Sequence, residues 1–400
     1  MAKFSWKIKS SSTKSKARIG CITTPHGKIE TPAFIFCATK GALKSFTTIE
    51  AKKINTQIIL SNTYHLMLHP GSKLIANHGG LHNFMNWNGP MLTDSGGFQI
   101  FSLGHGSVAN EIKAKKTQYL RDKSLLKINE EGALFKSYLN GKNYLLTPEK
   151  SIQVQRDLGA DLILVFDECT PFNVEKKYTE QSMKRSHRWA KRSINMFNSK
   201  LNYSPCYGSS GEQSLYGIVQ GGIYEDLRDE SIDFNLNEIK VFGIAIGGSL
   251  GSNKEEMYNV VNYTSKKLGE KHPIHLLGIG DPIDIWSLVR QGIDTFDCVS
   301  PTRLARHGSA LIKNKIGKIN INNAEYENSS KPIDKSCNCH TCKNYSLSYI
   351  HYLLKAKEFT ALYLITLHNI FFMNELMEFV RVSIKKDQLE EAEIEWYSKS

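Results

Sequence analysis

The sequence lacks a long apolar run. Its longest apolar stretch, residues 359–373, contains Thr366 and His368 and falls short of the roughly 18 apolar residues that span a bilayer. We therefore expect a buried helix there and no membrane partner. Residues 1–18 are rich in Lys and Ser but have no apolar centre, which argues against a secretory signal. Strands over 4–9 and from Ala17 are expected instead, with a basic transit-like arm as the alternative.

Internal repeats and a disulfide framework are also missing. No self-similarity occurs at periods of 20 to 50 residues, which excludes a solenoid or a propeller. The eight cysteines are not spread as disulfide partners, because three of them crowd together at Cys337, Cys339 and Cys342. In a cytosolic chain such a cluster more often binds a metal. We therefore predict a cytoplasmic protein.

An excess of basic residues is present. Lys and Arg number 51 against 39 Asp and Glu, which gives a net charge of +12. This excess favours a polyanionic partner, either nucleic acid or an anionic membrane surface, with an ordinary Lys-rich surface as the alternative. A 40% hydrophobic content excludes a wholly disordered chain. The length of 400 residues suits one large α/β barrel with an appendage.

Apolar segments alternate with amphipathic ones along most of the chain. The candidate strands are residues 57–60, 90–93, 162–166, 215–219, 242–246, 274–277 and 292–296. The candidate helices are residues 178–198, 224–233, 254–268 and 282–290. Strands that alternate with helices predict parallel βαβ units.

Polar residues and glycines follow the candidate strands at once. They include Asp94, Asp167, Gln220, Gly247 and Asp297. Turn chemistry explains any one of them, but a (β/α)8 TIM barrel gathers such residues at one active-site mouth. We therefore predict that barrel. Paired carboxylates there suit glycosidic chemistry, in which one attacks the anomeric carbon and the other transfers protons.

The cysteine cluster predicts a structural zinc site. Cys337, Cys339 and Cys342 supply three thiolates, and His368 is the expected fourth ligand because an unliganded imidazole in an apolar helix would be costly. His340 and His351 are the competing fourth ligands. No water-activating residue accompanies the set.

The expected domain organisation follows from these segments. Residues 1–330 form the barrel, with an N-terminal antiparallel β element and a Lys-rich insertion near 108–145. Residues 331–400 form a zinc-binding helical subdomain.

With these segments in view, the chain resembles the tRNA-guanine transglycosylase family, of the bacterial homodimeric type. The resemblance runs from about residue 15 to 385 and rests on residues 93–99 (TDSGGFQ), 166–171 (FDECTP), 217–222 (GIVQGG), 245–248 (AIGG), 277–280 (LGIG), 296–299 (FDCV) and 301–303 (PTR), and on the cysteine–histidine set. It implies exchange of the wobble guanine of GUN-anticodon tRNAs for a 7-deazaguanine base, preQ1 or queuine. It also implies a homodimer, one structural Zn2+ per chain and no DNA partner.

The resemblance assigns roles to particular residues. Asp297 resembles the nucleophile that attacks C1′ of the flipped nucleotide, and Asp94 resembles the general acid/base. The implied base-binding residues are Ser95, Gly96, Gly97, Phe98, Asp167, Gln220, Gly247, Gly248 and Leu277. The implied RNA-binding residues are Gly278, Ile279, Gly280, Asp281, Pro282, Ile283, Asp284, Thr302, Arg303, Leu304, Ala305 and Arg306.

The sequence departs from the family pattern in three places. Phe98 stands where many members have Tyr, and Leu277 stands where many have Met. Residues 247–252 (GGSLGS) are one residue shorter than the usual loop and lack its Glu. The cationic aminomethyl group of preQ1 favours a nearby carboxylate, so this loop places preQ1 in doubt and leaves queuine open.

Two other functions compete with an active transglycosylase. A non-catalytic tRNA-binding subunit of the same family should lose a catalytic carboxylate, whereas Asp94 and Asp297 are both present. A metal-dependent barrel hydrolase needs metal ligands at the strand ends, where His65 is the one candidate histidine.

Overall fold

The computed structural model describes residues 4–99, 125–171, 174–199, 212–248, 250–314 and 316–398. Eight parallel strands among them close into a barrel in the order β10-β11-β12-β13-β14-β4-β5-β6. These strands are β4 (Ala33–Cys37), β5 (Ile59–Ser61), β6 (Met91–Thr93), β10 (Leu162–Leu164), β11 (Ser214–Val219), β12 (Gly243–Ile246), β13 (Ile274–Leu276) and β14 (Thr295–Cys298). The barrel predicted from the sequence is confirmed.

The barrel strands are apolar because both of their faces are covered. All residues of β4, β10 and β12 are buried, as expected for parallel strands between a barrel interior and surrounding helices. The sequence prediction contains no strand at β4. This segment, AFIFC, directly follows Pro32 and has no alternation of polar and apolar residues. A short apolar run of this kind does not distinguish a buried strand from a buried helix.

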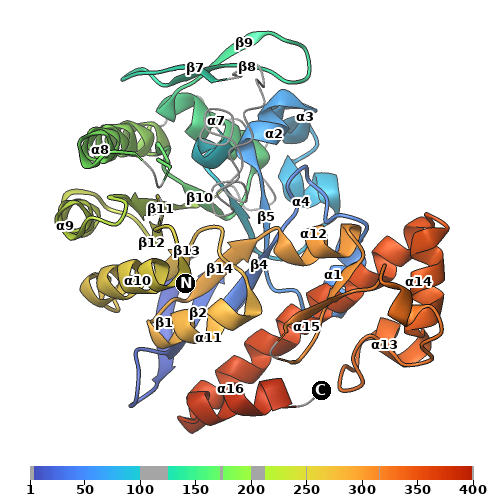
Figure 1. Cartoon of the computed structure of the whole chain (residues 1–400). Coiled ribbons are helices and arrows are strands. Elements are labelled where there is room, and N and C mark those ends of the chain that lie inside the picture. Colours follow the sequence, from blue (N-terminus) through green and yellow to red (C-terminus); the bar gives the residue numbers. More distant parts are fainter. Residues whose placement is uncertain are drawn as a thin grey trace. The chain divides into compact units, whose positions relative to one another are not determined.

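Helices separate the strands along the chain (Figure 1). They are α1 (Thr48–Lys53), α2 (Thr63–Leu68), α3 (Ser72–Asn77), α4 (Gly80–Met85), α7 (Pro148–Leu158), α8 (Lys176–Asn198), α9 (Glu225–Asp233), η1 (Phe234–Glu238), α10 (Lys254–Leu268), α11 (Pro282–Arg290) and α12 (Ser300–Arg306). The Asn253 and Asp281 side chains accept backbone N–H groups at the starts of α10 and α11, so these two helices begin where the sequence predicts.

The chain divides into two compact units. The first comprises residues 1–4, 24–26 and 61–275. It carries an antiparallel sheet of β7 (Leu125–Ile128), β8 (Ala133–Lys136) and β9 (Asn143–Leu146). Part of the predicted Lys-rich insertion therefore forms this sheet, and residues 108–124 lie outside the described residues.

The second unit comprises residues 5–23, 27–60 and 276–400. Its N-terminal strands are antiparallel, as predicted: β1 (Ser5–Ser11), β2 (Arg18–Thr24) and β3 (Gly27–Thr31). Its C-terminal elements are β15 (Ser309–Leu311), β16 (Lys318–Asn320), η2 (Ala324–Tyr326), α13 (His340–Asn344), α14 (Leu347–Lys355), α15 (Phe359–Lys386) and α16 (Leu389–Ser398). The domain boundary between residues 330 and 331 stays a prediction.

The long helix α15 organises the C-terminal elements of the second unit. In Figure 1, α12, α13 and α14 lie beside it, and all three contact it. Ile350 and Ile365 belong to the apolar cluster between these helices. The apolar stretch 359–373 is thus a buried helix, as predicted. None of the described helices is long and apolar enough to cross a membrane.

Candidate active site and metal centre

A buried carboxylate, Asp167, is the centre of a polar cluster in the first unit. It follows β10 and is 6% exposed. The Ser95 hydroxyl donates to its Oδ1 at 2.8 Å, and the Gln220 side-chain amide donates to its Oδ2 at 2.8 Å. Burial raises the pKa of Asp167 to about 6, an increase that these hydrogen bonds partly oppose. The structure therefore brings together three predicted base-binding residues.

At two of the predicted glycines the chain packs so closely against Asp167 and Gln220 that a side chain would not fit. A Cβ at Gly97 would lie 2.4 Å from Asp167 Oδ1 and 2.5 Å from its backbone oxygen. A Cβ at Gly248 would lie 2.6 Å from Gln220 Oε1, and the φ of +74° at Gly248 also favours glycine. The Gly97 amide donates to the Ser95 hydroxyl at 3.1 Å. The backbone at these two positions therefore packs directly against the side chains of Asp167 and Gln220.

Asp94, at the end of β6, is fixed by the N-terminus of α2. The Thr63 amide donates to its Oδ1 at 2.8 Å, and the Asn62 side-chain amide donates to its Oδ2. These two hydrogen bonds fix the orientation of the carboxylate at a half-buried position. Sequence reasoning missed both of them, although they occur in the segment SNTYH that drew attention to His65. His65 itself contacts the Tyr138 hydroxyl at 3.1 Å.

Asp297 is held in the second unit. The Gly278 amide donates to its Oδ1 at 3.0 Å, and the Cys37 thiol lies 3.7 Å from its Oδ2. The predicted bounds of this strand were wrong. Asp297 does not follow the strand but lies within β14, opposite Ile35 of β4. The predicted start, Gly292, has a φ of +90° and forms the turn after α11, so the strand begins three residues later.

The other residues assigned by resemblance differ in exposure. Phe98 is 50% exposed, Leu277 is half-buried, and Ile283, Arg303 and Arg306 are exposed. Five residues assigned to RNA binding are buried: Gly280, Pro282, Asp284, Thr302 and Ala305. Asp281 caps α11 by accepting the Ile283 amide at 3.2 Å. The exposed arginines of α12 are therefore the side chains of this set that can reach a phosphate.

The four predicted metal ligands lie together. The sulfurs of Cys337, Cys339 and Cys342 lie 3.6, 3.5 and 3.3 Å from His368 Nδ1. A tetrahedral zinc with bonds of about 2.3 Å to sulfur and 2.0–2.1 Å to nitrogen requires S···N separations of about 3.5 Å. The group can therefore hold a metal ion, and its geometry fits a closed tetrahedral site.

The surroundings select His368 as the fourth ligand. His368 is fully buried, and its Nε2 lies 2.7 Å from the Leu311 carbonyl. Donation to that carbonyl places the proton on Nε2 and leaves Nδ1 free for a metal. The competing candidates are occupied elsewhere, since His351 Nδ1 contacts the Ile321 carbonyl at 2.7 Å and His340 contacts the Asn344 side chain.

A second group of metal-binding residue types occurs among the described residues. It comprises His26, His82 and Asp161, and Asp161 directly precedes β10. The Asp161 carboxylate lies 2.7 Å from His26 Nδ1 and accepts the Met91 amide at 2.9 Å. These hydrogen bonds satisfy the carboxylate without a metal. The group lies at the amino ends of strands, so it does not support a hydrolase with its metal at the carboxyl ends.

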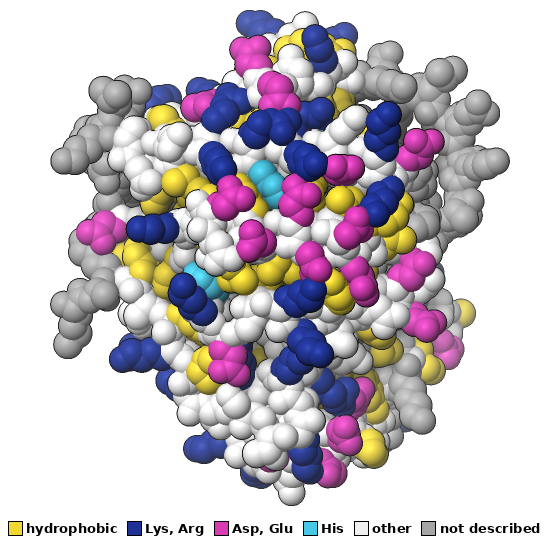
Figure 2. Space-filling model, turned by 90° about the vertical axis from the view of Figure 1, so that its left-hand side faces the viewer, with side chains coloured by type: hydrophobic (Ala, Val, Ile, Leu, Met, Phe, Trp, Pro, Cys, Tyr) yellow, Lys and Arg dark blue, Asp and Glu magenta, His cyan; other side chains and the backbone are white. Residues whose placement is uncertain are grey.

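Basic and acidic side chains are mixed on the face that carries α8, α9 and α10 (Figure 2). Ion pairs join neighbouring elements there: Lys176–Asp226 at 2.6 Å, Lys191–Glu238 at 2.7 Å and Lys267–Asp229 at 2.6 Å. The net positive charge of the chain is therefore not concentrated on this face, and we do not assign RNA binding to it.

A closed parallel barrel with carboxylates at its strand ends, followed by a Cys3His group that can hold a metal ion, is typical of an α/β-barrel enzyme. The family model described as queuine tRNA-ribosyltransferase matches residues 12–400. Proteins named queuine tRNA-ribosyltransferase from Roseiflexus sp. (strain RS-1) and Protochlamydia amoebophila are each 45% identical, over 96% and 97% of both chains. One from Thermoanaerobacter sp. is 42% identical over 100% of this chain and 98% of its own.

The chain belongs to the tRNA-guanine transglycosylase family. It is an enzyme of tRNA modification, and the function predicted from the sequence is confirmed at this level. The family acts on tRNA and a 7-deazaguanine base.

Proposed function

We propose that this chain exchanges the wobble guanine of GUN-anticodon tRNAs for a 7-deazaguanine base through a covalent enzyme–RNA intermediate. The observation that carries the proposal is the polar cluster around Asp167. An ionised carboxylate accepts hydrogen bonds from both N1–H and the 2-amino group of guanine, and no other standard base presents that pair of donors. The Ser95 and Gln220 side chains orient this carboxylate through its two oxygens.

The two remaining carboxylates perform the bond exchange in this proposal. Asp297 attacks C1′ of the flipped nucleotide, so that a C1′–O bond forms as the bond from C1′ to guanine breaks. Asp94 in its protonated form donates that proton to the leaving base and takes one back from the incoming base, whose nitrogen then displaces Asp297 from C1′. Hydrogen bonds orient both groups: the Gly278 amide donates to Asp297, and the Asn62 and Thr63 groups donate to Asp94.

Stacking and phosphate contacts complete the proposed substrate site. Phe98 and Leu277 stack on the base, which is worth about 1–3 kcal/mol for an aromatic contact. Gly247 and Gly248 read its O6 side, and Arg303 and Arg306 contact the RNA backbone.

The loop after β12 bears on which base is incorporated. Glu256, in the first turn of the following helix α10, accepts the Ser252 amide at 2.6 Å and the Ser252 hydroxyl at 2.8 Å. Glu256 therefore completes the cap of α10 and is engaged within the loop. We favour queuine over preQ1 on this ground. Competition of the two bases against labelled guanine tests it, and a preference for preQ1 by orders of magnitude would refute it.

The proposal extends to the cofactor, assembly and location of the protein. Cys337, Cys339, Cys342 and His368 hold one structural Zn2+, which fastens α13 to α15. The softness of three thiolates and an imidazole is the ground for zinc over magnesium or calcium. We further propose a homodimer in the cytoplasm.

Base exchange tests the proposal directly. Labelled guanine is incubated with the protein and a GUN-anticodon tRNA transcript, beside a matched transcript whose wobble guanine is replaced. Label should enter only the tRNA with the wobble guanine. Tight tRNA binding without any exchange would refute the proposal and favour the non-catalytic tRNA-binding subunit.

A further inference from the structure

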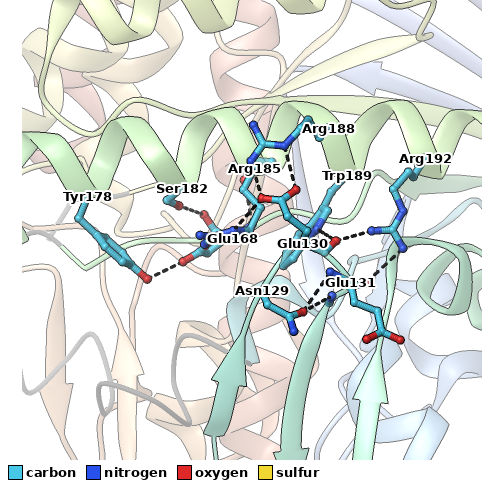
Figure 3. A network of polar contacts seen from close by, with 12 residues as sticks. Asn129, Glu130, Glu131, Glu168, Tyr178, Ser182, Arg185, Arg188, Trp189 and Arg192 are labelled. Carbon is cyan, nitrogen blue, oxygen red and sulfur yellow. Dashed lines mark hydrogen bonds and ion pairs between the residues drawn. The ribbon is translucent and has the colours of Figure 1, made fainter.

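Glu168, the residue after Asp167, is a second buried carboxylate that the proposed reaction does not use. It is 4% exposed. Figure 3 shows its side chain directed toward α8, where the Tyr178 hydroxyl donates to Oε1 at 2.7 Å and Arg185 donates to Oε2. The neighbouring side chain, Asp167, is bonded instead to Ser95 and Gln220. The two consecutive carboxylates therefore have separate sets of partners.

The backbone of Glu168 is fixed by the same helix. Its amide N–H donates to the Ser186 hydroxyl at 3.0 Å, and its carbonyl accepts the Ser182 hydroxyl at 3.1 Å. Both polar groups of the main chain and both oxygens of the side chain are thus bonded to α8. A buried ion pair contributes little net stability compared with apolar packing, so this arrangement is better explained by the accuracy with which it places the neighbouring residue.

The arginine that holds Glu168 also approaches the β7–β8 turn. Arg185 Nε lies 3.7 Å from Glu130 Oε1. Arg188, one turn further along the same face of α8, donates to Glu130 at 2.8 and 2.5 Å. Among the described residues, Arg188 is bonded to Glu130, and no hydrogen bond or ion pair joins it to Glu168. Arg188 is therefore a matched control, because it shares the helix face and Glu130 but not Glu168.

We propose that Glu168, clamped by Arg185 and Tyr178, is a positioning residue that aims the Asp167 carboxylate at the N1–H and 2-amino edge of the base. This inference rests on the proposed role of Asp167 in reading the base.

The close packing around Asp167 limits its movement. Its Oδ1 lies so close to Gly97 that a single added Cβ would approach it to 2.4 Å. A displacement of about half an ångström away from its donors would lengthen the 2.8 Å bonds from Ser95 and Gln220 beyond the usual hydrogen-bond range. The charge of Glu168 is one of the causes that raise the pKa of Asp167, and Arg185 partly offsets that charge. Loss of Arg185 should therefore weaken base binding both by moving Asp167 and by raising its pKa further.

The test compares Arg185→Gln with Arg188→Gln in the full-length protein. The measured quantities are KM for guanine, kcat at saturating tRNA, and the preference for guanine over hypoxanthine, which lacks the 2-amino group. Arg185→Gln should raise KM for guanine about tenfold and lower the preference by a similar factor, below the hundredfold that a 1 Å misplacement can cost. Its kcat should stay within about twofold. Arg188→Gln should match wild type in all three quantities within about twofold.

A double-mutant cycle shows whether Arg185 acts through Asp167. In an Asp167→Asn background, Arg185→Gln should weaken guanine binding no further, because the carboxylate that it positions is gone. Full additivity would overturn the inference, as would an unchanged KM and guanine preference in Arg185→Gln, or equal losses in Arg188→Gln. Should Arg185→Gln unfold, Arg185→Lys and Tyr178→Phe carry the same test with intermediate effects, and unchanged values in both would equally overturn it.

A failure of the inference about Glu168 and Arg185 can be distinguished from a failure of the proposed function. If wild type exchanges guanine and Asp167→Asn does not, the proposed role of Asp167 stands whatever Arg185 does. If wild type fails to exchange guanine, the proposed function itself fails.

Discussion

The affinity of the protein for a 7-deazaguanine base should fall as the pH drops below about 6. Asp167 must be ionised to accept two hydrogen bonds from the base, and burial raises its pKa from 3.8 to about 6. One pH unit below that value, about one molecule in ten carries the ionised carboxylate. The dissociation constant should therefore rise about tenfold between pH 7.5 and 5, with a slope approaching one decade per pH unit.

The same group affects stability in the opposite direction. A carboxyl whose pKa is raised by folding binds its proton more tightly in the folded state, so its ionisation opposes folding above about pH 6. A shift of about two units corresponds to about 3 kcal/mol as an upper limit. This destabilisation should lessen as the pH falls from about 6 towards 4. Acid thus weakens base binding without weakening the fold at this residue.

Calorimetric titration of the base into the protein, without tRNA, from pH 8 to 5 measures the effect. Omitting the tRNA separates base reading from the bond-exchange chemistry. Asp167→Asn is the control, and it should bind the base weakly with no pH dependence in this range. A wild-type dissociation constant that stays flat down to pH 5, or the same acid limb in Asp167→Asn, would refute the reasoning.

Three further predictions concern the metal site, the fold and the polar cluster around Asp167. His368→Ala should remove the bound metal and lower Tm, and metal analysis by mass spectrometry together with calorimetry checks this; retention of one metal per chain would count against the ligand assignment. Arg18→Met should destabilise the fold by about 3–5 kcal/mol because it strands Asp294, a buried partner held at 2.9 and 2.6 Å, and urea unfolding measures the loss; a change below 1 kcal/mol would contradict it. Gly97→Ala should reduce the affinity for guanine more than hundredfold, because its Cβ would collide with Asp167 2.4 Å away; wild-type affinity would show that the backbone can yield there.

Much of the barrel could be predicted because its elements carry local signals. α10 and α11 have the predicted bounds, since Asn253 and Asp281 mark their first turns by capping them. Local sequence patterns did not predict the elements whose presence or bounds depend on tertiary contacts. β4 has no alternating pattern because both of its faces are buried, and the limits of β14 depend on its pairing with β4.

The candidate site divides in the same way. Asp94, Asp167 and Asp297 could be recognised because each belongs to a distinctive motif at the end of a strand or within it. The groups that hold them could not, because Asn62, Gly278 and Cys37 are brought close only by the fold. The contacts of Tyr178 and Arg185 with Glu168 could not be predicted either, because nothing in the sequence of α8 distinguishes Arg185 from the other basic residues of that helix. The sequence already favoured His368 over His340 as the fourth metal ligand, and the S···N distances agree with that choice.

Formation of a covalent protein–RNA adduct tests the central claim most directly. The wild-type protein and Asp297→Asn are each incubated with a GUN-anticodon tRNA and separated on a denaturing gel. The account predicts a slow-migrating adduct with wild type, its decay when free guanine is added, and no adduct with Asp297→Asn. An adduct of equal yield in Asp297→Asn, or base exchange that persists in that variant, would contradict it.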